Sequence, residues 1–118
     1  MNIEELRDHC LSLKGATEDF PFDEFTLVLK VQGKMFGLIP LDNPETQITL
    51  KCDPERAIEL RDEYEAITAA WHFNKKHWNT VRIDPSISKA LLTELIQHSY
   101  DLVVAGLTRK LREELNNL

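Results

Sequence analysis

Three short segments in which apolar and polar residues alternate most strongly limit what this chain can fold into. They run from Phe25 to Val31, from Met35 to Ile39 and from Gln47 to Cys52. A repeat of two places alternate side chains on opposite faces of a β-strand. The turn residues Gln32-Gly33-Lys34 and the segment Leu41 to Thr46, which contains Asp42-Asn43-Pro44, separate them. The pattern therefore predicts three antiparallel strands in succession.

Capping signals mark helices on either side of these strands. Asn2, with Glu5 three residues later, forms a capping box that predicts a first helix ending before Gly15. Asp53 followed by Pro54 combines an N-cap with a first-turn proline, and predicts a second helix that reaches about Tyr64. The Asp84-Pro85 pair repeats this signal before a long stretch of helical periodicity. Gly106 is expected to end that helix, and Thr108 to cap a short terminal helix.

Two further strands complete the expected order of elements. Ile67–Phe73 and Trp78–Ile83 have strand patterns and are joined by a turn at Asn74–His77, whereas Ala16–Asp23 is expected to be a loop. The order is then α-β(3)-α-β(2)-α plus a short C-terminal helix. We expect an α+β fold, a two-layer sandwich with an antiparallel sheet. At 118 residues the chain is expected to form a single domain over residues 1–118.

Composition excludes several classes of protein. The chain has 14 Lys and Arg against 20 Asp and Glu, a net charge of −6, which excludes a generally basic nucleic-acid binder. No apolar stretch approaches the ~18 residues of a membrane span, so we expect no membrane partner. Two cysteines, Cys10 and Cys52, are too few for a disulfide framework and match no zinc motif. A cytoplasmic, monomeric protein is expected.

The charge is unevenly distributed along the chain. Residues 1–65 carry 7 basic and 15 acidic side chains, whereas residues 66–118 carry 7 basic and 5 acidic ones. Within the second part, the segment from Ala70 to Ile83 has no acid and interleaves aromatic with basic residues. A local basic and aromatic patch on an acidic protein favours one contact face over general adhesion to polyanions.

Five stretches of the chain together resemble one known family. They are HFNKKHWNTV at 72–81, GATEDFPF at 15–22, KMF at 34–36, LKCDPERA at 50–57 and SYDLV at 99–103. These stretches are similar to the YjbR/MmcQ family, in the expected order, over residues 11 to about 106. The resemblance implies the YjbR-like fold, similar to a secretion-chaperone-like arrangement. Similar proteins are described as binding DNA through a "double wing" of hairpins, so the resemblance also implies DNA binding of this kind.

The wings would be the turns Gln32–Lys34 and Asn74–His77. Double-stranded DNA would then be the partner, and the candidate contacts are Lys34, Lys75, Lys76 and Arg82 to phosphates, with His77 or Trp78 stacking or wedging at a groove. In the alternative interpretation the lysines only solvate a hairpin tip, while Trp71 and Trp78 pack in the core.

The faces of the last strand bear on this choice. Trp78, Thr80 and Arg82 alternate with Asn79, Val81 and Ile83. If Val81 and Ile83 face the helices, the side chains of Trp78, Thr80 and Arg82 lie on the open face of the sheet. That placement predicts a partly exposed Trp78.

No catalytic or metal-binding pattern is visible, and we expect a non-enzymatic protein without cofactors. His72 and His77 offer only two ligands, a weak basis for a zinc site. The acidic residues Glu18, Asp19, Asp23 and Glu24 are typical of a solvated loop.

A second class of function is an interaction or chaperone-like module with no nucleic-acid ligand. It would hold a partner's extended segment along an edge strand or on the open sheet face. The acids Glu4, Glu5 and Asp8 and those within Glu59–Glu65 would favour a basic protein partner.

Overall fold

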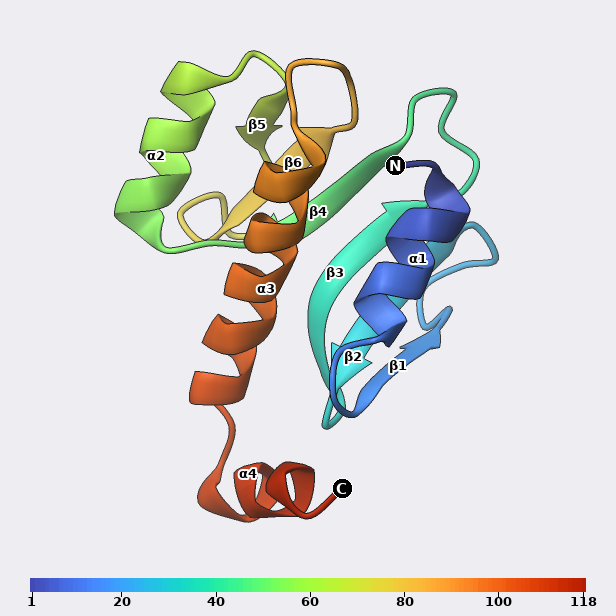
Figure 1. Ribbon diagram of the computed structural model, residues 1–118, viewed down its shortest axis with the longest axis vertical. Helices are drawn as coiled ribbons and strands as arrows, with labels where there is room; N and C mark the ends of the chain where they lie inside the picture. Colours follow the sequence, from blue (N-terminus) through green and yellow to red (C-terminus); the bar gives the residue numbers. More distant parts are fainter.

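The computed structural model describes all 118 residues as four helices and one six-stranded sheet (Figure 1). The elements in chain order are α1 (Ile3–Leu11), β1 (Ala16–Asp19), β2 (Thr26–Val31), β3 (Lys34–Pro40), β4 (Gln47–Lys51), α2 (Pro54–Glu63), β5 (Ile67–Ala69), β6 (Trp78–Arg82), α3 (Lys89–Ala105) and α4 (Arg109–Asn116). The fold is α+β, as expected, with one strand more than the sequence pattern indicates.

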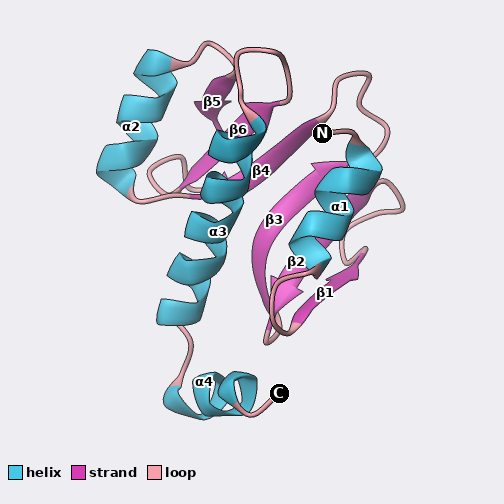
Figure 2. Cartoon of the chain, viewed as in Figure 1, coloured by secondary structure: helices cyan, strands magenta, loops and turns pink.

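All strand pairs are antiparallel, in the order β1-β2-β3-β4-β6-β5. The helices α1 and α3 cross one face of this sheet, and α2 lies beside β5 (Figure 2). One apolar core joins all four helices to the sheet, with Leu6, Phe36, Ile48 and Ile96 fully buried in it. The other face of the sheet carries no helix.

The helix-free face is not an exposed apolar plane. Val28 and Leu38 lie opposite each other on it, outside the main core, and are nevertheless buried. Thr49 and Thr80 meet next to them with their hydroxyl oxygens 3.0 Å apart. The middle of this face therefore offers little to a ligand, and a binding surface has to be sought at its ends.

The predicted caps hold at three helices and fail at one. Asn2 forms the full capping box with Glu5, Asp53 accepts from the Arg56 backbone N–H, and Thr108 accepts from that of Leu111. Helix α3 begins later than expected, because Ser88 rather than Asp84 is its N-cap. Asp84 instead accepts from the backbone N–H of Ser86 and closes a turn.

Two other segments differ from the sequence prediction. Ala16–Asp19, expected to be a loop, is the edge strand β1, in register with Val28–Val31, and Glu18 on it pairs with Arg7 of α1. The strand expected over Ile67–Phe73 stops at Ala69, so Ala70–His77 is a loop. Arg61 of α2 anchors this loop by donating to the Lys75 carbonyl.

No helix of the protein is both long enough and apolar enough to cross a membrane.

Candidate functional site

The ends of four elements meet at one place in the fold. β3 begins at Lys34, β4 ends at Lys51 and β6 begins at Trp78, and antiparallel pairing puts these positions at the same end of the sheet. Helix α3 ends at Ala105 beside them. A groove of about 310 Å³ opens here, which we call the end groove; it is lined by Lys34, Met35, Lys51, Trp78, Val103 and Gly106.

The end groove exists because β3 and β4 separate at this end of the sheet. They pair only at Gly37 with Leu50 and at Leu38 with Thr49, so Lys34–Phe36 has no partner on β4. Ser99 of α3 ties the diverging strands together. Its buried hydroxyl donates to the Phe36 carbonyl at 2.6 Å and accepts from the Lys51 backbone N–H at 2.9 Å.

Trp78 forms one wall of the end groove. It lies opposite Lys51 in the β4–β6 register, on the helix-free face, whereas its neighbours Asn79 and Val81 are buried. Its ring packs against Phe73, with centroids 5.6 Å apart, and the side chain is only partly buried. The predicted face assignment and the predicted partial exposure of Trp78 are thus confirmed.

The loop Ala70–His77 leads directly into this wall and presents a second aromatic side chain. Trp71 is 74% exposed, and the Nζ of Lys75 lies 4.8 Å from the centre of its ring, in cation–π geometry. Lys76 is exposed as well, and His77 is partly buried with its carbonyl accepting from Cys52 N–H. Neither tryptophan packs in the core, which contradicts this part of the alternative interpretation, whereas the exposure of Lys75 and Lys76 agrees with both interpretations.

The basic side chains near the end groove are free of carboxylate partners. The ion pairs of the molecule are Arg7–Glu18, Lys30–Asp19, Arg56–Glu94, Arg82–Asp84 and Arg109–Glu113. Lys34, Lys51, Lys75 and Lys76 take part in none of them. This leaves four uncompensated positive charges at one end of a protein with a net charge of −6.

The structure brings together some of the candidate residues and separates others. Lys34 and Trp78 share the end groove, and Lys75, Lys76 and His77 lie in the loop that precedes Trp78. Arg82 lies at the opposite end of β6, where its guanidinium is 3.2 Å from the Asp84 carboxylate. Lys51 is a groove residue that the sequence reasoning missed, because its place opposite Trp78 depends on the order of strands in the sheet.

The first of the two expected wings is not free-standing. Gln32, at the β2–β3 turn, donates from Nε2 to the Leu111 carbonyl of α4 at 2.8 Å. The backbone of Gln32 has a φ of +50°, in the left-handed region that residues other than glycine seldom adopt. Helix α4 therefore holds this turn against the body of the protein.

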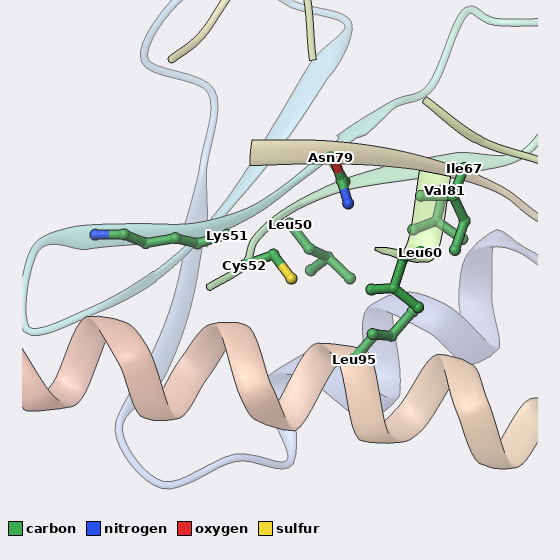
Figure 3. Close-up of a pocket in the computed structure, with 8 residues that line it drawn as sticks. All are labelled: Leu50, Lys51, Cys52, Leu60, Ile67, Asn79, Val81 and Leu95. Carbon is green, nitrogen blue, oxygen red and sulfur yellow. The ribbon is translucent and has the colours of Figure 1, made fainter. Parts of the chain in front are cut away.

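A small cavity shares Lys51 as a lining residue with the end groove but is more apolar (Figure 3). It measures about 10 Å³ and is lined mainly by apolar side chains, with Cys52, Leu60 and Leu95 directed into it and Lys51 directed away. Burial raises the pKa of the Cys52 thiol, which keeps it protonated and unreactive. The cavity is at most large enough for one water molecule.

The acidic residues Glu18, Asp19 and Asp23 are engaged in structural contacts. A hydrogen-bonded ion pair with Arg7 lowers the pKa of Glu18, and Asp19 pairs with Lys30 at 3.2 Å. Asp23 accepts from the backbone N–H groups of Phe25 and Thr26, which lower its pKa. No group of three or more His, Cys, Asp or Glu side chains is placed to hold a metal ion.

Comparison with known proteins gives relatives of similar size. The chain is 38% identical to the uncharacterized protein YbdF of Escherichia coli O157:H7 over 91 residues, covering 77% of this chain and 75% of that one. It is 30% identical to the uncharacterized protein YjbR of Escherichia coli K12 over the full length of both.

Solved structures show the same fold. The crystal structure of protein DR2400 of Deinococcus radiodurans, a DUF419-domain protein, matches with a TM-score of 0.90 and 40% identity, over 98% of this chain and 88% of that one. A crystal structure of a Pseudomonas syringae protein matches with a TM-score of 0.73 and 26% identity, over 86% and 98% of the two chains.

Four of the five stretches that carry the family resemblance contribute to the end groove. The stretch at 34–36 supplies Lys34 and Met35, and the stretch at 50–57 supplies Lys51. Trp78 comes from the stretch at 72–81 and Val103 from that at 99–103. The sequence model of the YjbR family matches residues 11–102, which is most of the chain. With this match and the relatives above, the chain belongs to the YjbR family.

Proposed function

We propose that this protein binds DNA through the end groove and the adjoining loop Ala70–His77. The observation that carries the proposal is the gathering of four unpaired lysines and two accessible tryptophans at one end of an acidic molecule. Lysines without carboxylate partners are available to phosphates, and binding to them releases counterions from the DNA. Accessible aromatic rings add stacking to this attraction.

The acidic remainder of the protein shapes the proposed interaction. Negative charge elsewhere repels DNA, so the approach is confined to one orientation and the affinity is modest. The proposal is for a binding protein and not an enzyme, acting as a monomer in the cytoplasm. Two buried free thiols, Cys10 and Cys52, support a reducing compartment.

The test is fluorescence anisotropy of labelled DNA, as a duplex and as its separate strand, titrated at low and at physiological salt. The double variant Lys75→Glu/Lys76→Glu is expected to lose most of the binding, because it reverses two charges in the loop. Lys89→Glu is the control, since Lys89 is exposed at the first turn of α3, while the groove lies at the other end of this helix, about 25 Å away.

Two results would contradict the proposal. One is the absence of binding to either form of DNA at low salt. The other is an equal loss of binding for each substituted residue in Lys89→Glu and in the double variant. Such binding would not depend on the surface formed by the end groove and the loop.

A second candidate function rests on the opposite end of the molecule. The β1–β2 connection exposes Phe20, Phe22 and Phe25, and Leu41 of the neighbouring connection is tied to Phe25 by a backbone hydrogen bond of 2.7 Å. Asp23, Glu24 and Asp42 lie in the same two segments, and Asp19 at the end of β1 directly precedes the first of them. An apolar patch with acidic residues around it suits a protein partner with basic and apolar residues.

Purification of such a partner distinguishes the two candidates. Its retention would be lost in Phe22→Ser and unchanged in Lys75→Glu/Lys76→Glu. The opposite dependence would exclude this patch as the docking surface.

A further inference from the structure

We infer that the end groove accepts a single unpaired nucleotide, so that the protein prefers single-stranded DNA to the duplex. The inference rests on the proposed function and names the form of DNA that it concerns. It follows from the shape of the groove, the chemistry of its lining and the way in which the two turns are held.

The shape of the site is concave. Elements that read a duplex project outward, as helices or β-ribbons that enter a groove of the DNA or as apolar wedges between its base pairs. Trp78 is instead recessed in a hollow and partly covered by Phe73. A side chain in a hollow cannot reach a base that is stacked inside a duplex, whereas an unpaired base can enter the hollow.

The lining matches the two parts of a nucleotide. The Trp78 ring offers a stacking surface to a base, and Met35 and Val103 provide apolar contacts. Lys34 and Lys51 come from the two strands that diverge around the groove, and supply positive charge for the phosphate on either side. A volume of about 310 Å³ lies at the small end of the range for sites that bind small molecules.

The hydrogen bonds around the groove indicate a binding site that is formed before the ligand arrives, and not two mobile hairpins that close on it. Ser99 bridges Phe36 and Lys51 and so fixes the separation of β3 and β4. Gln32 is bonded to α4, so the β2–β3 turn is not free to straddle a duplex together with the Ala70–His77 loop. A site formed in advance loses less conformational entropy when a base enters.

The first experiment compares a labelled twelve-residue oligothymidylate with a duplex of equal length by fluorescence anisotropy. The wild-type protein is expected to bind the single strand at least tenfold more tightly. Trp78→Leu is expected to weaken single-strand binding about tenfold, in the range found for loss of a stacked base. Trp71→Leu, the same change in the adjoining loop outside the groove, is expected to weaken it by a smaller factor than Trp78→Leu, and Trp78→Phe to retain most of the binding.

The intrinsic fluorescence of the protein supplies a second measurement. The chain has two tryptophans, so Trp71→Leu leaves Trp78 as the only one. Oligothymidylate is expected to quench the emission of this variant as it saturates. Circular dichroism of Trp78→Leu checks that a loss of binding is not a loss of fold.

The outcomes separate this inference from the proposed function. Duplex binding as tight as single-strand binding, or full binding by a folded Trp78→Leu, overturns the inference and leaves DNA binding standing. No binding to either form overturns the proposed function. Thymidine monophosphate is the remaining probe: if it binds in a Trp78-dependent way while neither DNA form does, the groove takes a free nucleotide, and both the proposed function and the preference for single-stranded DNA are overturned.

Discussion

At the scale of single residues, the two cysteines show how burial decides chemical behaviour. Cys10 lies on the core face of α1 and is fully buried, and burial raises the pKa of its thiol to about 12. Cys52 follows β4, is 4% exposed, and also has a raised pKa because of burial. The thiolate is the reactive form, so both side chains act as small apolar core residues.

We expect both thiols to resist alkylation in the native protein. At pH 8, iodoacetamide should label Cys10 and Cys52 many times more slowly than it labels the urea-unfolded chain, because both remain protonated and covered until the fold opens. Mass spectrometry of the two cysteine-containing peptides measures this. Rapid native labelling of Cys52 alone would show that the small cavity beside it is open to solvent.

At the scale of elements, Ser99 determines how α3 is joined to the sheet. Its hydroxyl replaces a missing hydrogen bond between β3 and β4, since it satisfies the Phe36 carbonyl and the Lys51 N–H at the point where the strands diverge. A buried backbone group left without a partner costs about 1–3 kcal/mol. The groove that depends on this separation is therefore tied to the stability of the fold.

Ser99→Ala is expected to lower the free energy of unfolding by about 2 kcal/mol, since it leaves both backbone groups without their partner. Thr93→Ala removes a hydroxyl from the same helix, where it bonds only to the Lys89 and Ala90 carbonyls of that helix. This control is expected to change stability by less than about 0.5 kcal/mol. Urea unfolding measures both, and equal effects would show that the hydroxyl of Ser99 does not join the strands.

The elements themselves were largely predictable, because capping and alternation are local. The β1 strand was missed because Thr17, Glu18 and Asp19 are polar residues on an edge, and their strand conformation comes from pairing with β2 and from the Arg7 contact. The start of α3 was misplaced because Asp84-Pro85 fits a turn as well as it fits a cap. At β1, contacts distant in sequence outweigh the low strand preference of these residues. At α3, Ser88 takes the N-cap position in place of Asp84.

At the scale of the whole molecule, the uneven distribution of charge is visible in the sequence, but its arrangement in space is not. The acid-free segment Ala70–Ile83 and Lys34 at the β2–β3 turn indicate basic surfaces in the sequence, and the structure adds Lys51 at the end of β4. The meeting of the two lysines with Trp78 requires β4 to lie between β3 and β6. Alternation within a strand determines which side chains share a face but not which strands are neighbours. The sequence therefore indicates Lys34 through its turn, but neither the place of Lys51 in the groove nor the meeting of these lysines with Trp78.

This arrangement limits how strongly binding can depend on salt. For single-stranded DNA the logarithm of the affinity falls with the logarithm of salt concentration by about 0.7 for each phosphate neutralised. If Lys34, Lys51, Lys75 and Lys76 each neutralise one, the slope should be about −3. Lys34→Gln/Lys51→Gln should make it shallower by about 1.4, whereas Lys89→Gln should leave it unchanged. Anisotropy titrations at several salt concentrations measure these slopes. A wild-type slope much steeper than −3, or one that the groove variant leaves unaltered, would show that phosphates are held on another surface of the protein.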